Sequence, residues 1–281
     1  MRLTVASYSF EVLPLEVTLM IAHTMGFKGV DIAGFHNRGR ASYEPSEVAA
    51  NPQKYADHLN GLLAKYELEA VDFFPQFALD FAERSMNDPD PKVRQQNIDE
   101  FRGLVQFCKL TRTPGITVLP GVDHLGIPLE KNLDTAGETF RHLVKIAGDA
   151  GVLLHFEAHM GSLTDTPELA LALIERAPGT TLTLDYSHFI LQYIPIERIH
   201  ALIPYTGHVH IRPMRPGKLQ TRWAKGTVDF VDIAQRLEAV GYKGCLSVEY
   251  VCSDWFDSNQ VDTLSETIAA KTALESYIPV V

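Results

Sequence analysis

The sequence contains little cysteine, no long apolar run and no excess of positive charge. Its three cysteines, Cys108, Cys245 and Cys252, form an odd, sparse set without CxxC spacing, which excludes a disulfide framework and a thiolate zinc site. No apolar run reaches the roughly 18 residues of a membrane span. The first residues read as a strand and not as a secretory signal. We therefore expect a cytoplasmic protein that does not contact a membrane.

The balance of charge bears on the partner. The formal net charge is −10 over 281 residues. Nucleic-acid binding draws most of its affinity from Lys and Arg on phosphates, so this balance argues against nucleic acid as a partner.

Short β-rich runs alternate with stretches of helical period along the whole chain. The predicted strands are 3–7, 29–33, 70–74, 116–119, 152–157, 181–185, 208–211 and 245–250. The predicted helices are 15–25, 52–66, 91–110, 135–150, 166–176, 196–202, 230–240 and 261–277. Repeated βα units build parallel sheets, and eight of them favour closure. An open doubly wound sheet is the alternative, but residues 7–10 lack its glycine-rich turn. We predict one (β/α)₈ (TIM) barrel domain over residues 1–281.

Polar residues interrupt the last four predicted strands at their C-terminal ends, although a buried parallel strand should be apolar throughout. These residues are Glu157, Asp185, His210 and Glu249. All strand C-termini of a barrel converge on one face, so the four side chains should meet there. Three buried carboxylates repel one another without a cation. The ligand set predicts Mn²⁺ first, with Mg²⁺, Co²⁺ and Zn²⁺ as alternatives, and does not suit a structural zinc site.

Further polar residues lie close to these strand ends. His188 follows Asp185 in a turn and is expected to contact the substrate. His208 shares a strand side with His210, because side chains alternate with period 2. His159 and His208 are expected either to contact the substrate or to orient the metal ligands. His155 is interpreted as a core or ligand-supporting residue.

Four segments together resemble the xylose-isomerase-like superfamily: Phe156–His159, Leu184–His188, His208–His210 and Val248–Tyr250. The resemblance implies that Glu157, Asp185, His210 and Glu249 bind the metal and that His188 binds substrate. It also implies an acid/base pair of Glu157 and Glu249. Arg212 and Arg215 fall where this superfamily often places a substrate-contacting arginine.

The resemblance implies an isomerase or epimerase that abstracts a proton beside a carbonyl of a small sugar or keto-sugar. Leu163 stands where ketose 3-epimerases usually carry a further glutamate. This difference and the basic loop 213–221 keep a lyase or dehydratase on a keto-inositol or 3-keto-glycoside, including C-glycoside cleavage, as the alternative. We expect Arg212, Arg215 and Gln220 of this loop region to reach the substrate.

Two remoter alternatives are an endonuclease IV-like phosphodiesterase and a non-enzymatic sugar-binding barrel. The first lacks the histidine expected after strand three, and intact ligands disfavour the second. We also expect a homo-oligomer, either alone or with a small accessory subunit.

Overall fold

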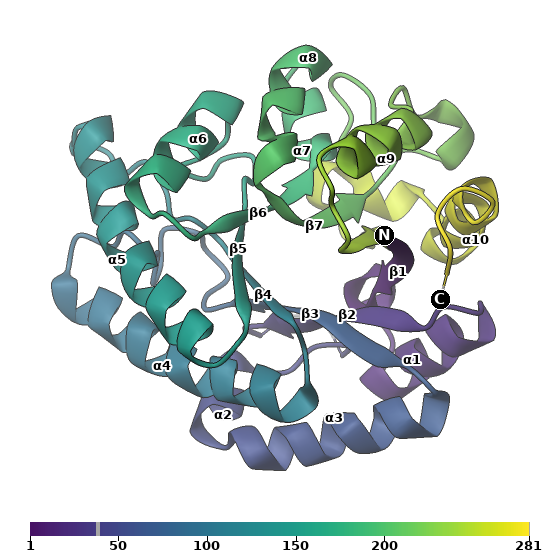
Figure 1. Ribbon diagram of the computed structural model, residues 1–281, viewed down its shortest axis with the longest axis horizontal. Helices are drawn as coiled ribbons and strands as arrows, with labels where there is room; N and C mark the ends of the chain where they lie inside the picture. Colours follow the sequence, from purple (N-terminus) through teal and green to yellow (C-terminus); the bar gives the residue numbers. More distant parts are fainter. Residues whose placement is uncertain (38–39, 281) are drawn as a thin grey trace.

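The computed structural model describes residues 1–37 and 40–280 and shows a closed barrel of parallel strands in the order β1 to β8 (Figure 1). The strands are β1 Arg2–Ala6, β2 Gly29–Phe35, β3 Glu69–Gln76, β4 Gly115–Val118, β5 Leu153–Glu157, β6 Thr181–Asp185, β7 Thr206–Ile211 and β8 Cys245–Val248. β1 pairs with β8 through the register Thr4 to Ser247, which closes the sheet. The predicted (β/α)₈ barrel is confirmed.

Helices surround the barrel in chain order. They are α1 Leu15–Thr24, α2 Pro45–Ala50, α3 Pro52–Tyr66, α4 Pro91–Thr111, α5 Leu129–Asp149, α6 Pro167–Arg176, α7 Tyr186–Ile190, α8 Ile196–Ile199, α9 Phe230–Ala239 and α10 Thr263–Leu274. Short 3₁₀ turns are η1 Ser7–Phe10, η2 His200–Tyr205, η3 Trp223–Lys225 and η4 Trp255–Gln260. Within the described ranges, no helix has both the length and the apolarity needed to cross a membrane.

Local signals in the sequence set several helix boundaries. The Thr166 side chain accepts a hydrogen bond from the Leu169 amide and begins α6, with Pro167 in its first turn. Asp229 caps α9 in the same way. Gly151 has a φ of +74° directly after α5, where a side chain would be strained. Two differences from prediction are the short helices α2 and α7, which the sequence pattern did not predict. A third is α5, which begins at Leu129, six residues before the predicted start.

The apolar core lies between the barrel and the helices, and the interior of the barrel is polar. Outward-facing strand residues such as Val5, Ile32 and Val209 belong to the main hydrophobic cluster. TIM barrels usually fill their interior with bulky branched side chains. Here each strand contributes at least one buried polar residue, and one set with a member from every strand is Thr4, Asp31, Asp72, Thr117, His155, Thr183, His208 and Ser247. We call this set the polar layer.

Hydrogen bonds connect the polar layer across the barrel. Thr117 Oγ1 donates to Asp72 Oδ2 at 2.7 Å and lies 2.6 Å from Thr183 Oγ1. His208 on β7 reaches Asp31 on β2, which is far from it around the sheet. These contacts show that the side chains point inward.

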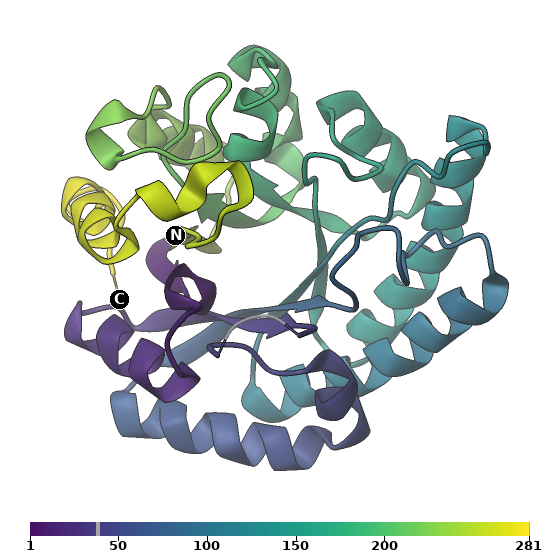
Figure 2. The ribbon, with the colours of Figure 1, turned by 180° about the vertical axis from the view of Figure 1, so that it is seen from behind.

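Figure 2 shows the barrel from behind the view of Figure 1, at the end that carries the loops following the strands. There the yellow segment after β8 lies beside the purple turn η1 that follows β1. The Ser9 side chain joins them, because its Oγ donates to the Val248 carbonyl at 3.3 Å and accepts from the Tyr250 amide at 2.9 Å. The C-terminal ends of β5 to β8 meet the same space.

Candidate metal centre and active site

The structure brings together the four residues that the strand-end pattern selected. Glu157 ends β5, Asp185 ends β6, His210 lies near the end of β7 and Glu249 directly follows β8. One donor atom from each lies within 4.8 Å of the donors of the other three, and all four residues are buried. Ninety-two residues of sequence separate the two glutamates, since 249 − 157 = 92, yet the barrel places both beside His210.

Two carboxylates compete for one side of the His210 ring. His210 Nδ1 donates a hydrogen bond to Glu157 Oε1 at 2.8 Å, and Glu249 Oε2 lies equally close at 2.8 Å. One N–H serves only one of them, so Glu249 Oε2 is buried without a hydrogen-bond partner among the described residues. Although burial lowers the pKa of His210, the Glu249, Asp31 and Glu157 carboxylates raise it well above its ordinary value.

The cluster holds more negative charge than its own cations balance. Burial, with repulsion from Glu249 and Asp185, raises the pKa of Glu157 to about 7 despite the hydrogen bond from His210. A carboxyl with so high a pKa marks a place where an additional positive charge is stabilised.

Arg212 supplies a cation that the strand-end argument did not include. Its guanidinium donates to Asp185 Oδ2 and lies 3.3 Å from Glu249 Oε1, and its Nε donates to Ser187 Oγ at 3.2 Å. Burial alone would raise the pKa of Asp185, but the Arg212 charge holds it well below its ordinary value. The side chain is 1% exposed and also lines the cavity above the cluster.

A cavity of about 720 Å³ opens above the cluster, and two further predicted residues line it. His188 lies with Nε2 at 3.4 Å from Asp185 and 3.8 Å from Glu157, and within the described part of the chain neither of its ring nitrogens has a hydrogen-bond partner. Burial and the neighbouring His159 hold the pKa of His188 well below its usual range, so the ring is neutral. His159 donates from Nδ1 to the Met160 carbonyl at 2.7 Å, which leaves Nε2 as an acceptor.

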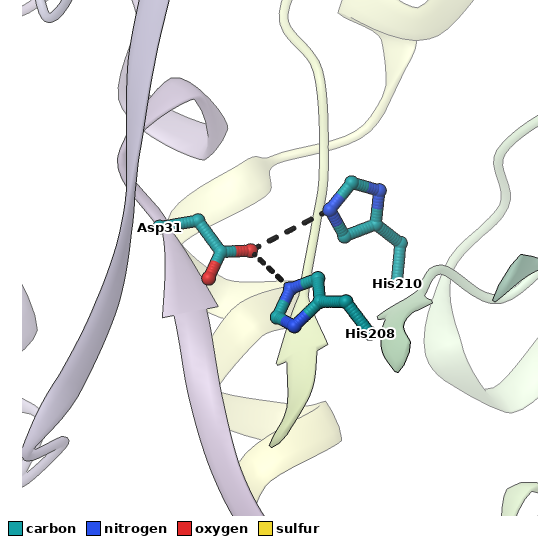
Figure 3. Close-up of side chains that lie close together, drawn as sticks. All are labelled: Asp31, His208 and His210. Atoms are coloured by element: carbon teal, nitrogen blue, oxygen red, sulfur yellow. Dashed lines mark hydrogen bonds and ion pairs between the residues drawn. The ribbon is translucent and has the colours of Figure 1, made fainter. Parts of the chain in front are cut away.

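His208 precedes His210 on β7 and does not line the cavity. Figure 3 shows that the rings of His208 and His210 both point toward Asp31. His208 Nε2 donates to Asp31 Oδ2 at 2.9 Å, and the same oxygen lies 3.5 Å from His210 Nε2. Tyr8 Oη approaches His210 Nε2 at 3.0 Å. Asp31 and Tyr8 therefore fix the His210 ring so that Nδ1 faces the carboxylates. Of the two expectations for His208, this placement agrees with support of the ligands and not with substrate contact.

The basic loop after β7 lies differently from the expectation. Arg215 is exposed, and neither it nor Gln220 lines the cavity. Gln220 is buried and hydrogen-bonds the backbone of the segment after β8 at Val251 and Ser258. This loop therefore supports a neighbouring loop, and Arg212 alone of the three reaches the cavity.

The residues present fit a divalent cation. Two carboxylate oxygens, one of them without a hydrogen-bond partner in residues 1–37 and 40–280, converge on His210 Nδ1, and Asp185 completes a buried O/O/N/O set. A neutral His210 with its proton on Nε2, facing Asp31 and Tyr8, presents the Nδ1 lone pair to such an ion. This donor set suits Mn²⁺, Mg²⁺, Co²⁺ or a catalytic Zn²⁺.

The family model for the xylose isomerase-like TIM barrel matches residues 19–274. The chain therefore belongs to the xylose isomerase-like TIM barrel family. A search of the curated proteins found no match.

Several solved structures share the fold. D-psicose 3-epimerase with D-tagatose, from Clostridium cellulolyticum H10, has a TM-score of 0.76 at 17% identity and covers 99% of both chains. The 3-keto-D-glucoside 4-epimerase of E. coli, in its apo form, has a TM-score of 0.71 at 16% identity over 97% of this chain and 99% of its own. The IolI protein with a zinc atom has a TM-score of 0.74 at 20% identity over 99% and 100%. At these identities the likeness shows the fold.

Proposed function

We propose that this protein is a divalent-metal-dependent isomerase or epimerase that abstracts a proton beside the carbonyl of a small sugar or keto-sugar. The observation that carries the proposal is the convergence of Glu157, Asp185, His210 and Glu249 in one buried cluster. Glu157 and Glu249 of this cluster also line a 720 Å³ cavity. The similar structures include sugar epimerases and a zinc-bound protein, which supports the same class.

The four ligands would hold the ion, with Mn²⁺ as the first candidate. When bound, the ion supplies Lewis-acid polarisation of the substrate carbonyl and a neighbouring hydroxyl. Asp185 and His210 are two of the proposed ligands, and other residues of the same chain also hold them. Arg212 donates a hydrogen bond to Asp185, and Asp31 lies beside His210. We assign Asp185 and His210 to binding alone.

Glu157 and Glu249 are the proposed acid/base pair. Both belong to the cluster and also line the cavity. Each can therefore reach a substrate carbon in the cavity as well as the ion. Abstraction by one and return of the proton by the other on the opposite face gives an epimerisation, and return at the neighbouring carbon gives an isomerisation. His188 and Arg212 line the same space and bind substrate hydroxyl or carbonyl oxygens.

A lyase or dehydratase acting on a keto-inositol or 3-keto-glycoside is the second candidate, and Leu163 favours it. This residue is 1% exposed and takes the place of the further glutamate usual in ketose 3-epimerases. After proton abstraction, loss of a β-substituent needs a group that protonates the leaving oxygen. His159 lines the cavity with Nε2 as an acceptor, so it is placed to serve as the base. Glu157, whose pKa is raised to about 7, is then the group that protonates the leaving oxygen.

The experiment that tests the proposal follows solvent-deuterium uptake by NMR in Mn²⁺, with ketoses, keto-inositols and 3-keto-glycosides as substrates. Exchange at the carbon beside the carbonyl is expected with at least one of these classes, and the product distinguishes epimerisation from elimination. If no class exchanges while the protein binds one Mn²⁺ per chain, the proposal is wrong.

The endonuclease-type alternative gains no support from the geometry. His36, which follows β2, is half-buried, and its Nδ1 lies 2.8 Å from Glu44 Oε1. It does not line the cavity. Within the described residues, the three candidate ligand groups draw on β2, β5, β6 and β7 and on the segments directly after β5, β6 and β8, and none includes a residue that follows β2 or β3.

Replacing Arg212 with lysine is expected to lower kcat/KM about 10²–10³-fold, the usual cost of losing one fixed donor to a developing negative oxygen. Lysine keeps the positive charge beside Asp185 but cannot reproduce the forked contacts to Asp185, Ser187 and substrate. Steady-state kinetics measure the loss. Arg215→Lys is the matched control, because Arg215 is exposed and outside the cavity. An unchanged kcat/KM in Arg212→Lys removes this residue from the site.

Replacing Asp31 with asparagine is expected to weaken divalent-metal affinity about 10–100-fold, the range for lost support of a metal-bound histidine. Asp31 Oδ2 is the acceptor that fixes the ring of His208 and lies next to His210 Nε2. Isothermal titration with Mn²⁺ measures the change. Asp72→Asn is the control, since Asp72 is equally buried but hydrogen-bonds Thr117. Equal effects of the two variants would show a general loss of packing.

A further inference from the structure

The cavity has a polar floor and an apolar upper wall. The floor consists of the charged and histidine residues already described. The upper lining is mostly aromatic or aliphatic and comes from the end of β2 and from the segments after β3, β5 and β8: Phe35, Leu79, Phe81, Met160, Trp255 and Phe256. Such a division points to a ligand with one polar end and one apolar end.

A continuous series of rings leads from the floor to the mouth. His188 and His159 lie with ring centroids 3.9 Å apart. His159 in turn stacks on Trp255, with centroids 5.3 Å apart and planes 23° from parallel. Phe81 meets His159 edge-on at 4.9 Å. We call His159, Trp255 and Phe81 the aromatic wall, and it begins directly beside the residue that faces the cluster.

The outer side chains remain accessible. Leu79 is 49% exposed, Trp255 40% and Phe256 41%, and all three line the cavity mouth. Exposed large apolar side chains gathered in one patch are a feature of ligand-binding grooves, whereas singly scattered ones are common on any protein surface.

The chain holds the Trp255 segment in place from beneath. Buried Gln220 accepts from the Val251 amide at 2.9 Å and donates to the Val251 and Ser258 carbonyls, so it joins both ends of the segment. Phe256 and Asp257 both have positive φ, 50° and 54°, a conformation that side chains rarely adopt. This local strain is retained in a segment whose apolar side chains turn toward the cavity.

We propose that the substrate is a keto-glycoside with a flat aromatic aglycone, whose sugar ring lies on the polar floor and whose aryl group lies against the aromatic wall. Cavities of about 300–1,000 Å³ hold drug-sized ligands, and a single sugar ring is much smaller than these. The 720 Å³ cavity therefore has room for a second ring beyond the sugar. This inference rests on the proposed function, which places the sugar at the floor.

Binding can be measured without turnover, using phenyl β-D-glucopyranoside against methyl β-D-glucopyranoside in the Mn²⁺-loaded protein. The chain has two tryptophans, and Trp223 stacks on Phe230 away from the cavity. A Trp223→Phe background leaves Trp255 as the sole tryptophan fluorophore. The phenyl glycoside is expected to quench it and to bind at least about tenfold more tightly than the methyl glycoside, as aromatic contacts plus apolar burial imply.

Variants of the aromatic wall test whether Trp255 causes the preference for the phenyl glycoside over the methyl glycoside. Trp255→Ala, measured by calorimetry, is expected to bring the two glycosides to within about threefold of each other, and Trp255→Phe should keep most of the preference. Trp223→Phe is the control and should keep all of it. Equal binding of phenyl and methyl glycosides by the unmodified protein, or a preference that survives Trp255→Ala, overturns the proposal.

The two proposals fail in different ways. Deuterium exchange with a methyl 3-keto-glucoside but no preference for an aryl group would overturn the aglycone proposal and leave the proposed chemistry intact. A preference for the phenyl glycoside that depends on Trp255, without deuterium exchange in any keto-sugar, would support the aromatic wall and overturn the proposed chemistry.

Discussion

Glutamine at position 157 or 249 is expected to lower kcat about 10²–10⁴-fold, the usual contribution of a positioned acid or base. Both side chains line the cavity and meet at His210 Nδ1, but only one can accept its N–H. Glutamine keeps an oxygen for the metal and loses the ability to take a proton. The measurement is solvent-deuterium exchange, with metal content determined on the same sample.

The pattern of loss in these variants separates the candidate reactions. An epimerisation with one acid/base group on each face requires both glutamates, so both variants should stop the reaction. An elimination that uses one of them leaves the other variant with most of its exchange. Glu100→Gln is the matched control, because Glu100 is largely buried beside Arg84 and lies outside the cavity. Full exchange in both Gln variants with metal retained would assign proton transfer to His159 or His188.

Removal of divalent metal is expected to abolish exchange and to lower the Tm by about 5–16 °C. A ligand present at 100 to 1,000 times its Kd stabilises by about 2.7–4.1 kcal/mol, and each kcal/mol moves the Tm of a protein of this size by about 2–4 °C. The reason is local: among the described residues, the cations in contact with Glu157, Asp185 and Glu249 are Arg212 and His210, so three carboxylates face two cations when the ion is absent. Calorimetry after chelation, and again after Mn²⁺ is restored, measures the shift.

An Asp185→Ala variant provides the control for metal removal. It lacks one proposed ligand, so Mn²⁺ should raise its Tm far less than that of the unmodified chain. Titration with Mg²⁺, Co²⁺ and Zn²⁺ then ranks the metals by activity restored. Complete exchange in metal-free protein, checked by elemental analysis, would contradict the role of the cluster.

The fold and the cluster could be predicted because both follow from periodic signals. The strand boundaries 181–185 agree with β6 without change, and helix 52–66 agrees with α3. Glu157, Asp185, His210 and Glu249 each break an apolar strand at the same end, and barrel closure alone brings them together. Neither the prediction of the fold nor that of the cluster requires knowing at which level along the barrel axis a side chain lies.

Depth within the barrel is what the sequence did not reveal. His208 and His210 share a strand side, but only the structure shows that His208 lies one layer lower, against Asp31. Asp31 and Asp72 interrupt β2 and β3 as clearly as the late carboxylates interrupt theirs, and this signal was available. Trp255 and Gln220 lie in loops, where no periodicity relates one residue to another, so their contacts depend on the fold.

The polar layer also limits how such a protein can be made tolerant to heat. Replacing buried ionic pairs with well-packed apolar side chains often stabilises a protein by about 1–4 kcal/mol. Asp72, whose pKa burial raises to about 7, and His155, whose pKa burial lowers to about 3, are the natural positions for such an exchange. Asp31 and His208 differ, because they hold the ring of a proposed ligand. An engineer working on this barrel can therefore redesign the half of the layer around β3 and β5, and should leave the half between β2 and β7 unchanged.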